Sequence, residues 1–231
     1  MISFGLITEG LTDQIVIENI LAGYFKNPDL DIRPLQPERD KDDENKSHNY
    51  GGWTLVFDYC KSNIFRESFQ SNEYIIIQID TDSLVDSENY NYNVSSQDEN
   101  GDKFTTQQLI AKVIEKFRGA IGEDFYSQNQ QKIVFAISVH SIECWLLPLY
   151  YTDNKKAKYI NCLKTLNDKV FKKHKFTIDK NAKNPKYYRE ISKQYGKHKV
   201  LMQHYQDNPS LKTFIEEIQS RNIQIVVEDG W

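Results

Sequence analysis

Long hydrophobic runs are missing from this sequence, and so is any pattern of paired cysteines. No apolar stretch approaches the roughly 20 residues that a membrane-spanning helix needs. The N-terminus has no basic segment ahead of its apolar residues and soon reaches Glu9 and Asp13, which is not typical of a secretory signal. The cysteines are Cys60, Cys144 and Cys162; they are odd in number, far apart and without a CxxC pair, so we expect neither a disulfide framework nor a zinc site. These absences favour a cytoplasmic protein that does not interact with membranes.

The composition allows a packed core, and the charged residues are distributed unevenly along the chain. The chain has 231 residues, of which 39% are hydrophobic and 27% charged, which suits one domain of ordinary size or a core domain with an appendage. The net charge of -4 conceals a local balance of about +12 between residues 154 and 204, where about 15 Lys and Arg residues stand against three acids. Such a division is more informative about binding partners than the overall pI.

Hydrophobic periodicity predicts an α/β core with a mainly parallel sheet. Short apolar runs typical of buried strands alternate with amphipathic segments typical of helices. The clearest strand, over residues 74–79, is apolar on both faces, as expected for a central parallel strand covered by helices. The predicted strands cover 2–7, 31–35, 74–79 and 132–139, and the predicted helices between them cover 12–25, 53–69 and 105–119.

The same patterns divide the chain into two parts. Residues 1–150 form the predicted core, with long inserted loops over 36–52 and 83–104. Residues 151–231 form a basic, mostly helical extension. Its predicted elements are helices over 155–171, 185–205 and 210–221 and a candidate final strand over 223–228.

Acidic residues follow two of the predicted strands. Glu9 comes just after the first strand, and Asp80 and Asp82 come just after the clearest one. Parallel sheets place their sites at the carboxyl ends of the strands, so these acids are expected to converge. A divalent cation relieves the repulsion of clustered carboxylates, and oxygen ligands without His or Cys favour Mg²⁺ or Mn²⁺. Each acid also has a structural interpretation: Glu9 in a turn before a helix, Asp13 as a helix N-cap, and Asp80 and Asp82 as solvated strand ends.

Two further residues near a late strand are candidates for the site. Glu143 lies in an apolar stretch between Ile142 and Trp145, where an unpaired carboxylate is costly, which favours a role in the site. His140 directly follows the predicted strand over 132–139 and is either a structural histidine or an acid or base.

These patterns resemble the Toprim domain of topoisomerases, primases, small ribonucleases and overcoming-lysogenization-type nucleases. The matching segments are GLITEGLTD over residues 5–13 and IQIDTD over residues 77–82. The segment SIECWLL over residues 141–147 is similar to a motif in small stand-alone Toprim nucleases of bacterial defence loci. The resemblance covers roughly residues 1–150 and implies a Rossmann-like Toprim fold.

The resemblance also implies residue roles and a biological setting. Glu9, Asp80, Asp82 and Glu143 would be catalytic, and Glu9, Asp13, Asp80 and Asp82 would bind the Mg²⁺ or Mn²⁺ ion. Proteins of this branch act in defence against phage or mobile elements. A toxic effector of that kind is expected to work with a regulatory partner protein such as an ATPase.

The lysine-rich region after residue 154 is expected to bind nucleic acid. Lysines neutralise phosphates, and the aromatic residues between them can stack on exposed bases. Lys predominates over Arg, which fits attraction to the backbone better than reading of bases. The other interpretations are a solvated helical face and a surface that docks on the acidic part of the chain or on a partner. The candidate nucleic-acid-binding residues are Lys155, Lys156, Lys172, Lys173, Lys175, Lys183, Lys186 and Arg189.

Together these features predict a metal-dependent endonuclease that acts on DNA or RNA. One alternative is a Toprim-like module that binds nucleic acid or a partner without cutting. A further alternative is an α/β phosphotransferase, such as a haloacid-dehalogenase-like phosphatase. In that family the Asp-x-Asp pair normally follows the first strand, whereas here the first strand ends in Glu9-Gly10.

Overall fold

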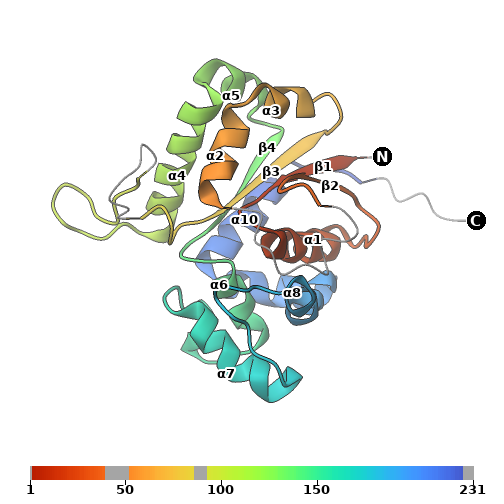
Figure 1. Cartoon of the computed structure of the whole chain (residues 1–231), viewed down its shortest axis with the longest axis vertical. Helices are drawn as coiled ribbons and strands as arrows, with labels where there is room; N and C mark the ends of the chain where they lie inside the picture. The colour runs from red at the N-terminus through yellow and green to blue at the C-terminus, as the bar shows by residue number, and fades with distance from the viewer. Residues whose placement is uncertain (1, 40–51, 86–92, 226–231) are drawn as a thin grey trace, which may run out of the picture.

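The computed structural model describes residues 2–39, 52–85 and 93–225. They contain a four-stranded sheet in the order β2-β1-β3-β4, with each neighbouring pair parallel. Helices cover both faces of the sheet (Figure 1). The prediction of an α/β fold with a parallel sheet flanked by helices is confirmed. The strands are β1 (Ser3–Ile7), β2 (Asp31–Gln36), β3 (Tyr74–Asp80) and β4 (Ile133–Ser138).

One face of the sheet packs against helices from the middle of the chain. Alternate residues of β3, namely Ile75, Ile77 and Ile79, are buried in the hydrophobic cluster on this face. The longest of these helices begins with a capping box, in which Thr105 Oγ1 accepts the N–H of Gln108 and the Gln108 side chain accepts the N–H of Thr105. These helices are α2 (Trp53–Lys61), α3 (Asn63–Ser68), α4 (Thr106–Ile121) and α5 (Glu123–Asn129).

The opposite face packs against the first helix and the C-terminal helices. A Cβ atom on Gly23 of α1 would lie 1.9 Å from the carbonyl oxygen of Tyr195, so only glycine allows this close approach of α1 to the turn η4. On this face β3 presents Ile76, then Gln78 and Asp80, so the strand becomes polar toward its carboxyl end. The elements are α1 (Leu11–Phe25), α8 (Pro185–Ser192), η4 (Lys193–Gly196), α9 (His198–His204) and α10 (Pro209–Ser220).

Residues on both sides of position 150 share this second hydrophobic core. Trp145 is fully buried, its indole N–H donates to Ser210 Oγ at 2.8 Å, and its ring stacks on Phe214. The C-terminal helices therefore complete the core of the sheet. The remaining elements of this region are α6 (Glu143–Leu146), η2 (Leu147–Leu149), η3 (Asn154–Ala157), α7 (Cys162–His174) and η5 (Tyr205–Asp207).

Several predicted boundaries differ from the structure. The helix predicted over 155–171 is divided into η3 and α7, because Asn161 has a left-handed φ of 54° and ends any continuous helix there. Residues 223–225 are irregular, and the rest of the predicted final strand lies outside the described residues, as do positions 40–51 and 86–92 of the predicted loops. None of the helices in the described part of the chain is long and apolar enough to cross a membrane.

The structure corrects the prediction that the cysteines form no disulfide. Cys144 on α6 and Cys162 at the start of α7 are joined by a disulfide, with Cα atoms 5.0 Å apart. The two residues are 18 positions apart, and they meet because α6 and α7 pack together in the core, which spacing alone does not show. Cys60 is buried and is a free thiol.

Candidate active site

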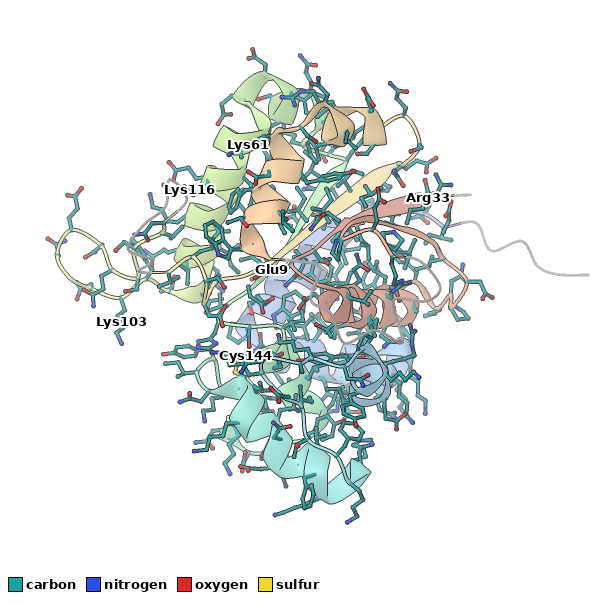
Figure 2. The ribbon with its side chains drawn as sticks, viewed as in Figure 1. Glu9, Arg33, Lys61, Lys103, Lys116 and Cys144 are labelled. Carbon is teal, nitrogen blue, oxygen red and sulfur yellow. A yellow bond between two sulfur atoms is a disulfide. The ribbon has the colours of Figure 1, made fainter. Side chains whose placement is uncertain are left out.

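The predicted acids lie at the carboxyl ends of neighbouring parallel strands. Glu9 follows β1, Asp80 is the last residue of β3, and Glu143 opens the helix that follows β4. Because β1, β3 and β4 are adjacent in the sheet, these side chains lie at the same edge of it. Glu9 is labelled in Figure 2. This is the edge at which open α/β sheets form their binding sites.

A hydrogen-bonded clasp joins Glu9 to Asp80. Glu9 Oε2 accepts the backbone N–H of Asp80 at 2.8 Å. Gln78 binds both sides: its Oε1 accepts the Glu9 N–H at 3.2 Å, and its Nε2 donates to Asp80 Oδ1 at 2.9 Å. Ser138, which lies opposite Asp80 on β4, donates to the same Oδ1 at 2.7 Å. The orientation of Asp80 is therefore fixed by two neighbouring side chains.

Asp13 lies in the first turn of α1, and its carboxylate is almost fully buried. It does not cap the helix, because the N-cap position is Gly10. Asp13 Oδ1 has no hydrogen-bond partner among the described residues. A Cβ on Gly10 would lie 3.0 Å from Asp13 Oδ2, so the glycine leaves room for this carboxylate. A buried carboxylate oxygen without a partner needs a cation or a donor.

Glu143 is buried beside a lysine and a tyrosine from the C-terminal region. Its Oε1 lies 2.8 Å from Lys183 Nζ and also accepts a short hydrogen bond from the Tyr188 hydroxyl. Burial acts to raise the pKa of Glu143, but Lys183 and the hydrogen bonds outweigh it and hold the pKa below its usual value. The same ion pair raises the pKa of Lys183 against the effect of burial. Glu143 is therefore ionised and paired.

The pKa values of Glu9, Asp13 and Asp80 are raised. Burial raises the pKa of Glu9 to about 8, and the charge of Asp13 adds to the shift. Burial raises the pKa of Asp13 to about 6, although Lys183 opposes it. Asp80 has a pKa well above its usual value because of burial and then the charges of Asp13 and Glu9. The cluster thus holds more negative charge than Lys183 balances, so it favours protons or a further cation.

Asp82 differs from Asp80 in its surroundings. The chain turns at Thr81, whose N–H donates to the Ser138 carbonyl at 3.0 Å, and Asp82 is exposed beyond that turn. The Asp82 N–H donates to the carbonyl of His140 at 3.0 Å. His140 itself has a left-handed φ of 72°, and its buried Nδ1 has no hydrogen-bond partner within the described chain. Asp82, whose charge acts on Glu9 and Asp13, therefore lies on the solvent side of the buried acids.

The donor chemistry of the site fits a hard divalent cation, although the acids do not form a finished ion cage. No group of three or more His, Cys, Asp or Glu side chains among residues 2–39, 52–85 and 93–225 is arranged to hold a metal ion. The oxygen-only donor set and the unpartnered oxygen of Asp13 nevertheless suit Mg²⁺ or Mn²⁺. Glu9, Asp13, Asp80 and Asp82 are the residues that would hold it.

The predicted basic residues occupy two different environments. Lys183 lies within the acidic cluster, and Lys156 pairs with Asp207 at 2.7 Å. Lys155 lies over the ring of Tyr151, and Lys173 over that of Tyr150. The predicted basic residues that are exposed at the surface are Lys155, Lys172, Lys173, Lys175, Lys186 and Arg189.

Sequence reasoning missed the polar residues that support the acids. Gln78, Ser138 and Tyr188 are fully buried. Gln78 could have been noticed, because it is the one polar residue inside an otherwise apolar strand over 74–79. Tyr188 carries no comparable signal, since it resembles its neighbours in a Tyr-rich and Lys-rich segment.

Comparisons of the chain with protein-family models, with curated proteins and with solved structures found no match. The fold and the site by themselves define a parallel α/β protein with a buried acidic cluster at the carboxyl edge of its sheet. A closer assignment depends on the chemistry of that cluster.

Proposed function

We propose that this chain is a Toprim-type, Mg²⁺- or Mn²⁺-dependent nuclease that cleaves phosphodiester bonds in DNA or RNA. The observation that carries the proposal is the clasp between Glu9 and Asp80, set among buried acids at the ends of β1 and β3. Buried carboxylates with raised pKa values at the ligand-binding edge of a sheet are typical of functional sites.

In this proposal the chain supplies a positioned set of oxygen ligands. Glu9, Asp13, Asp80 and Asp82 would hold the ion, which when bound polarises the phosphodiester and promotes attack by water. Gln78 and Ser138 fix the Asp80 carboxylate through its Oδ1. Glu143 completes the site as a carboxylate kept ionised by Lys183.

The substrate and setting follow from the rest of the chain and from the Toprim resemblance. The exposed lysines of α7 and α8 would attract the phosphate backbone without reading sequence. By analogy with the defence-associated branch, the protein would act in the cytoplasm as an antiviral or toxic effector, together with a partner such as an ATPase.

Cleavage assays test the proposal directly. Plasmid, single-stranded DNA and tRNA are incubated with Mg²⁺ or Mn²⁺, using the wild type, Glu9→Gln and Asp80→Asn. We expect each variant to lose at least about 100-fold in rate, because each removes a charged ligand of the ion. Glu115→Gln, an exposed acid on α4, is the matched control and should keep wild-type activity. Cleavage that persists in both site variants would sink the site assignment.

A non-catalytic nucleic-acid-binding module is the second candidate. It is favoured by the ion pair between Glu143 and Lys183, which already supplies one cation to the cluster, and by the lack of a finished ion cage within the described residues. This candidate predicts salt-sensitive binding that survives Asp80→Asn, with no cleavage by the wild type.

A further inference from the structure

A cavity of about 530 Å³ adjoins the acidic cluster. Asp82 and His140, which follow β3 and β4, form part of its wall. The loop before α4 contributes Lys103 and Phe104, and the segment before α7 contributes Tyr159 and Ile160. The cavity is therefore bounded on one side by a predicted ligand of the metal ion. Another cavity, of about 1050 Å³, lies beside α4 and includes none of the predicted site acids.

Two large side chains stand exposed at the edge of the 530 Å³ cavity. Tyr159 is 55% exposed and Ile160 is 47% exposed. The segment that carries them is fixed at its end by the disulfide from Cys162 to Cys144, next to Glu143 (Cys144 and Lys103 are labelled in Figure 2). The disulfide therefore anchors the backbone two residues after Ile160. An exposed aromatic ring beside such an anchored point of the backbone is suited to stacking.

The polar groups of the cavity suit a nucleotide better than an apolar ligand. Lys103 supplies a positive charge, and His140 adds a further polar residue to the wall. Thr81 and Thr106 add hydroxyl groups to the wall. A flat aromatic ligand with hydrogen-bonding edges and an attached phosphate would match the ring, the hydroxyls and the lysine together. The segment that carries Tyr159 leads into α7, whose exposed lysines carry further positive charge.

We infer that this cavity binds an unpaired nucleobase beside the phosphodiester that the acidic cluster acts on, an inference that rests on the proposed nuclease function. A base in a duplex is stacked and paired, so it cannot enter such a cavity without being extruded. The substrate class is therefore single-stranded nucleic acid, or a single-stranded part of a larger one. Tyr159 would stack on the base.

Binding measurements in EDTA test this inference without cleavage. The probes are a labelled single strand of about 12 nucleotides and the matching duplex. We expect Tyr159→Ala to weaken single-strand binding at least about fivefold, the lower end for one base stacked on an aromatic ring. Tyr159→Phe keeps the ring and should bind within about twofold of the wild type, and duplex binding should not depend on Tyr159.

Phe171→Ala is the matched control, because Phe171 is equally exposed, lies among the lysines of α7 and is outside this cavity. An equal loss of affinity in Phe171→Ala and Tyr159→Ala would overturn the inference, as would unchanged single-strand binding by Tyr159→Ala or an equal loss for single strand and duplex. Cleavage that needs Asp80 but not Tyr159 would overturn the base site alone. Tyr159-dependent binding without any cleavage by the wild type would overturn the nuclease proposal alone.

Discussion

Replacing Lys183 with methionine should destabilise the protein strongly. Lys183 Nζ lies 2.8 Å from Glu143 Oε1, and its charge also acts against the raised pKa values of Asp13 and Asp80. Lys183→Met keeps most of the apolar stem of the side chain. It removes the positive charge from the buried and partly buried acids, which are Glu9, Asp13, Asp80 and Glu143.

The magnitude follows from the ion pair. At this distance and an effective dielectric constant of about 20, the attraction is about 6 kcal/mol, and desolvation offsets part of it. Removing one partner of a buried pair costs about 3–5 kcal/mol. Because the side chain of Lys183 is 24% exposed, we expect the lower end, about 3 kcal/mol.

Urea denaturation at pH 7 measures this change in the free energy of unfolding. Lys186→Met is the matched control, since Lys186 is exposed on the neighbouring helix α8, and it should change stability by less than about 0.5 kcal/mol. Adding Glu143→Gln to Lys183→Met should recover part of the loss, because the unpaired charge is removed. A cost for Lys183→Met of less than about 1 kcal/mol, or one equal to that of Lys186→Met, would show that the fold does not depend on the Lys183–Glu143 ion pair.

Three further predictions concern the pH, the disulfide and the clasp. The free energy of unfolding of the metal-free protein should fall by on the order of 3 kcal/mol between pH 5 and pH 8, because Glu9 and Asp13, with pKa values of about 8 and 6, keep protons in the folded state that they lose when unfolded. Urea denaturation at pH 5 and pH 8 measures this fall in the free energy of unfolding. Adding Mg²⁺ should restore stability at pH 8. A free energy of unfolding that rises with pH would contradict the prediction. Reducing the Cys144–Cys162 disulfide should lower the free energy of unfolding by about 3 kcal/mol for a loop of 18 residues. Identical denaturation curves with and without reductant would show that the Cys144–Cys162 disulfide does not stabilise the protein. Gln78→Leu should slow cleavage by about 10- to 100-fold in the assay above without changing the circular dichroism, because Asp80 loses a partner that orients it. Wild-type rates in that variant would show that the clasp is not needed.

The sheet and the positions of its acids could be predicted because both depend on local patterns. A run of β-branched residues identified β3, and Asp80 ends this run, which placed its side chain at the carboxyl edge of the sheet. The same logic placed Glu9 after β1. The burial of both carboxylates and their connection through Gln78 depend on which strands become neighbours, and that is a tertiary property.

The C-terminal part was harder to predict because its residues act through long-range contacts. Lys183 resembles every other lysine in a basic segment, yet it alone among the predicted nucleic-acid-binding residues is paired with Glu143 in the described structure. The disulfide has the same origin, since Cys144 and Cys162 become neighbours only when α6 and α7 pack. Composition gave the charge of this region, but it could not give the position of a single side chain.

Anomalous diffraction from crystals soaked in Mn²⁺ shows whether the acidic cluster binds a divalent cation. We expect an anomalous peak within bonding distance of carboxylate oxygens of Asp80 and Glu9, at the carboxyl edge of the sheet, and no such peak in Asp80→Asn crystals. A soaked wild-type crystal with no peak at this cluster, or with Mn²⁺ only at other sites, would contradict it.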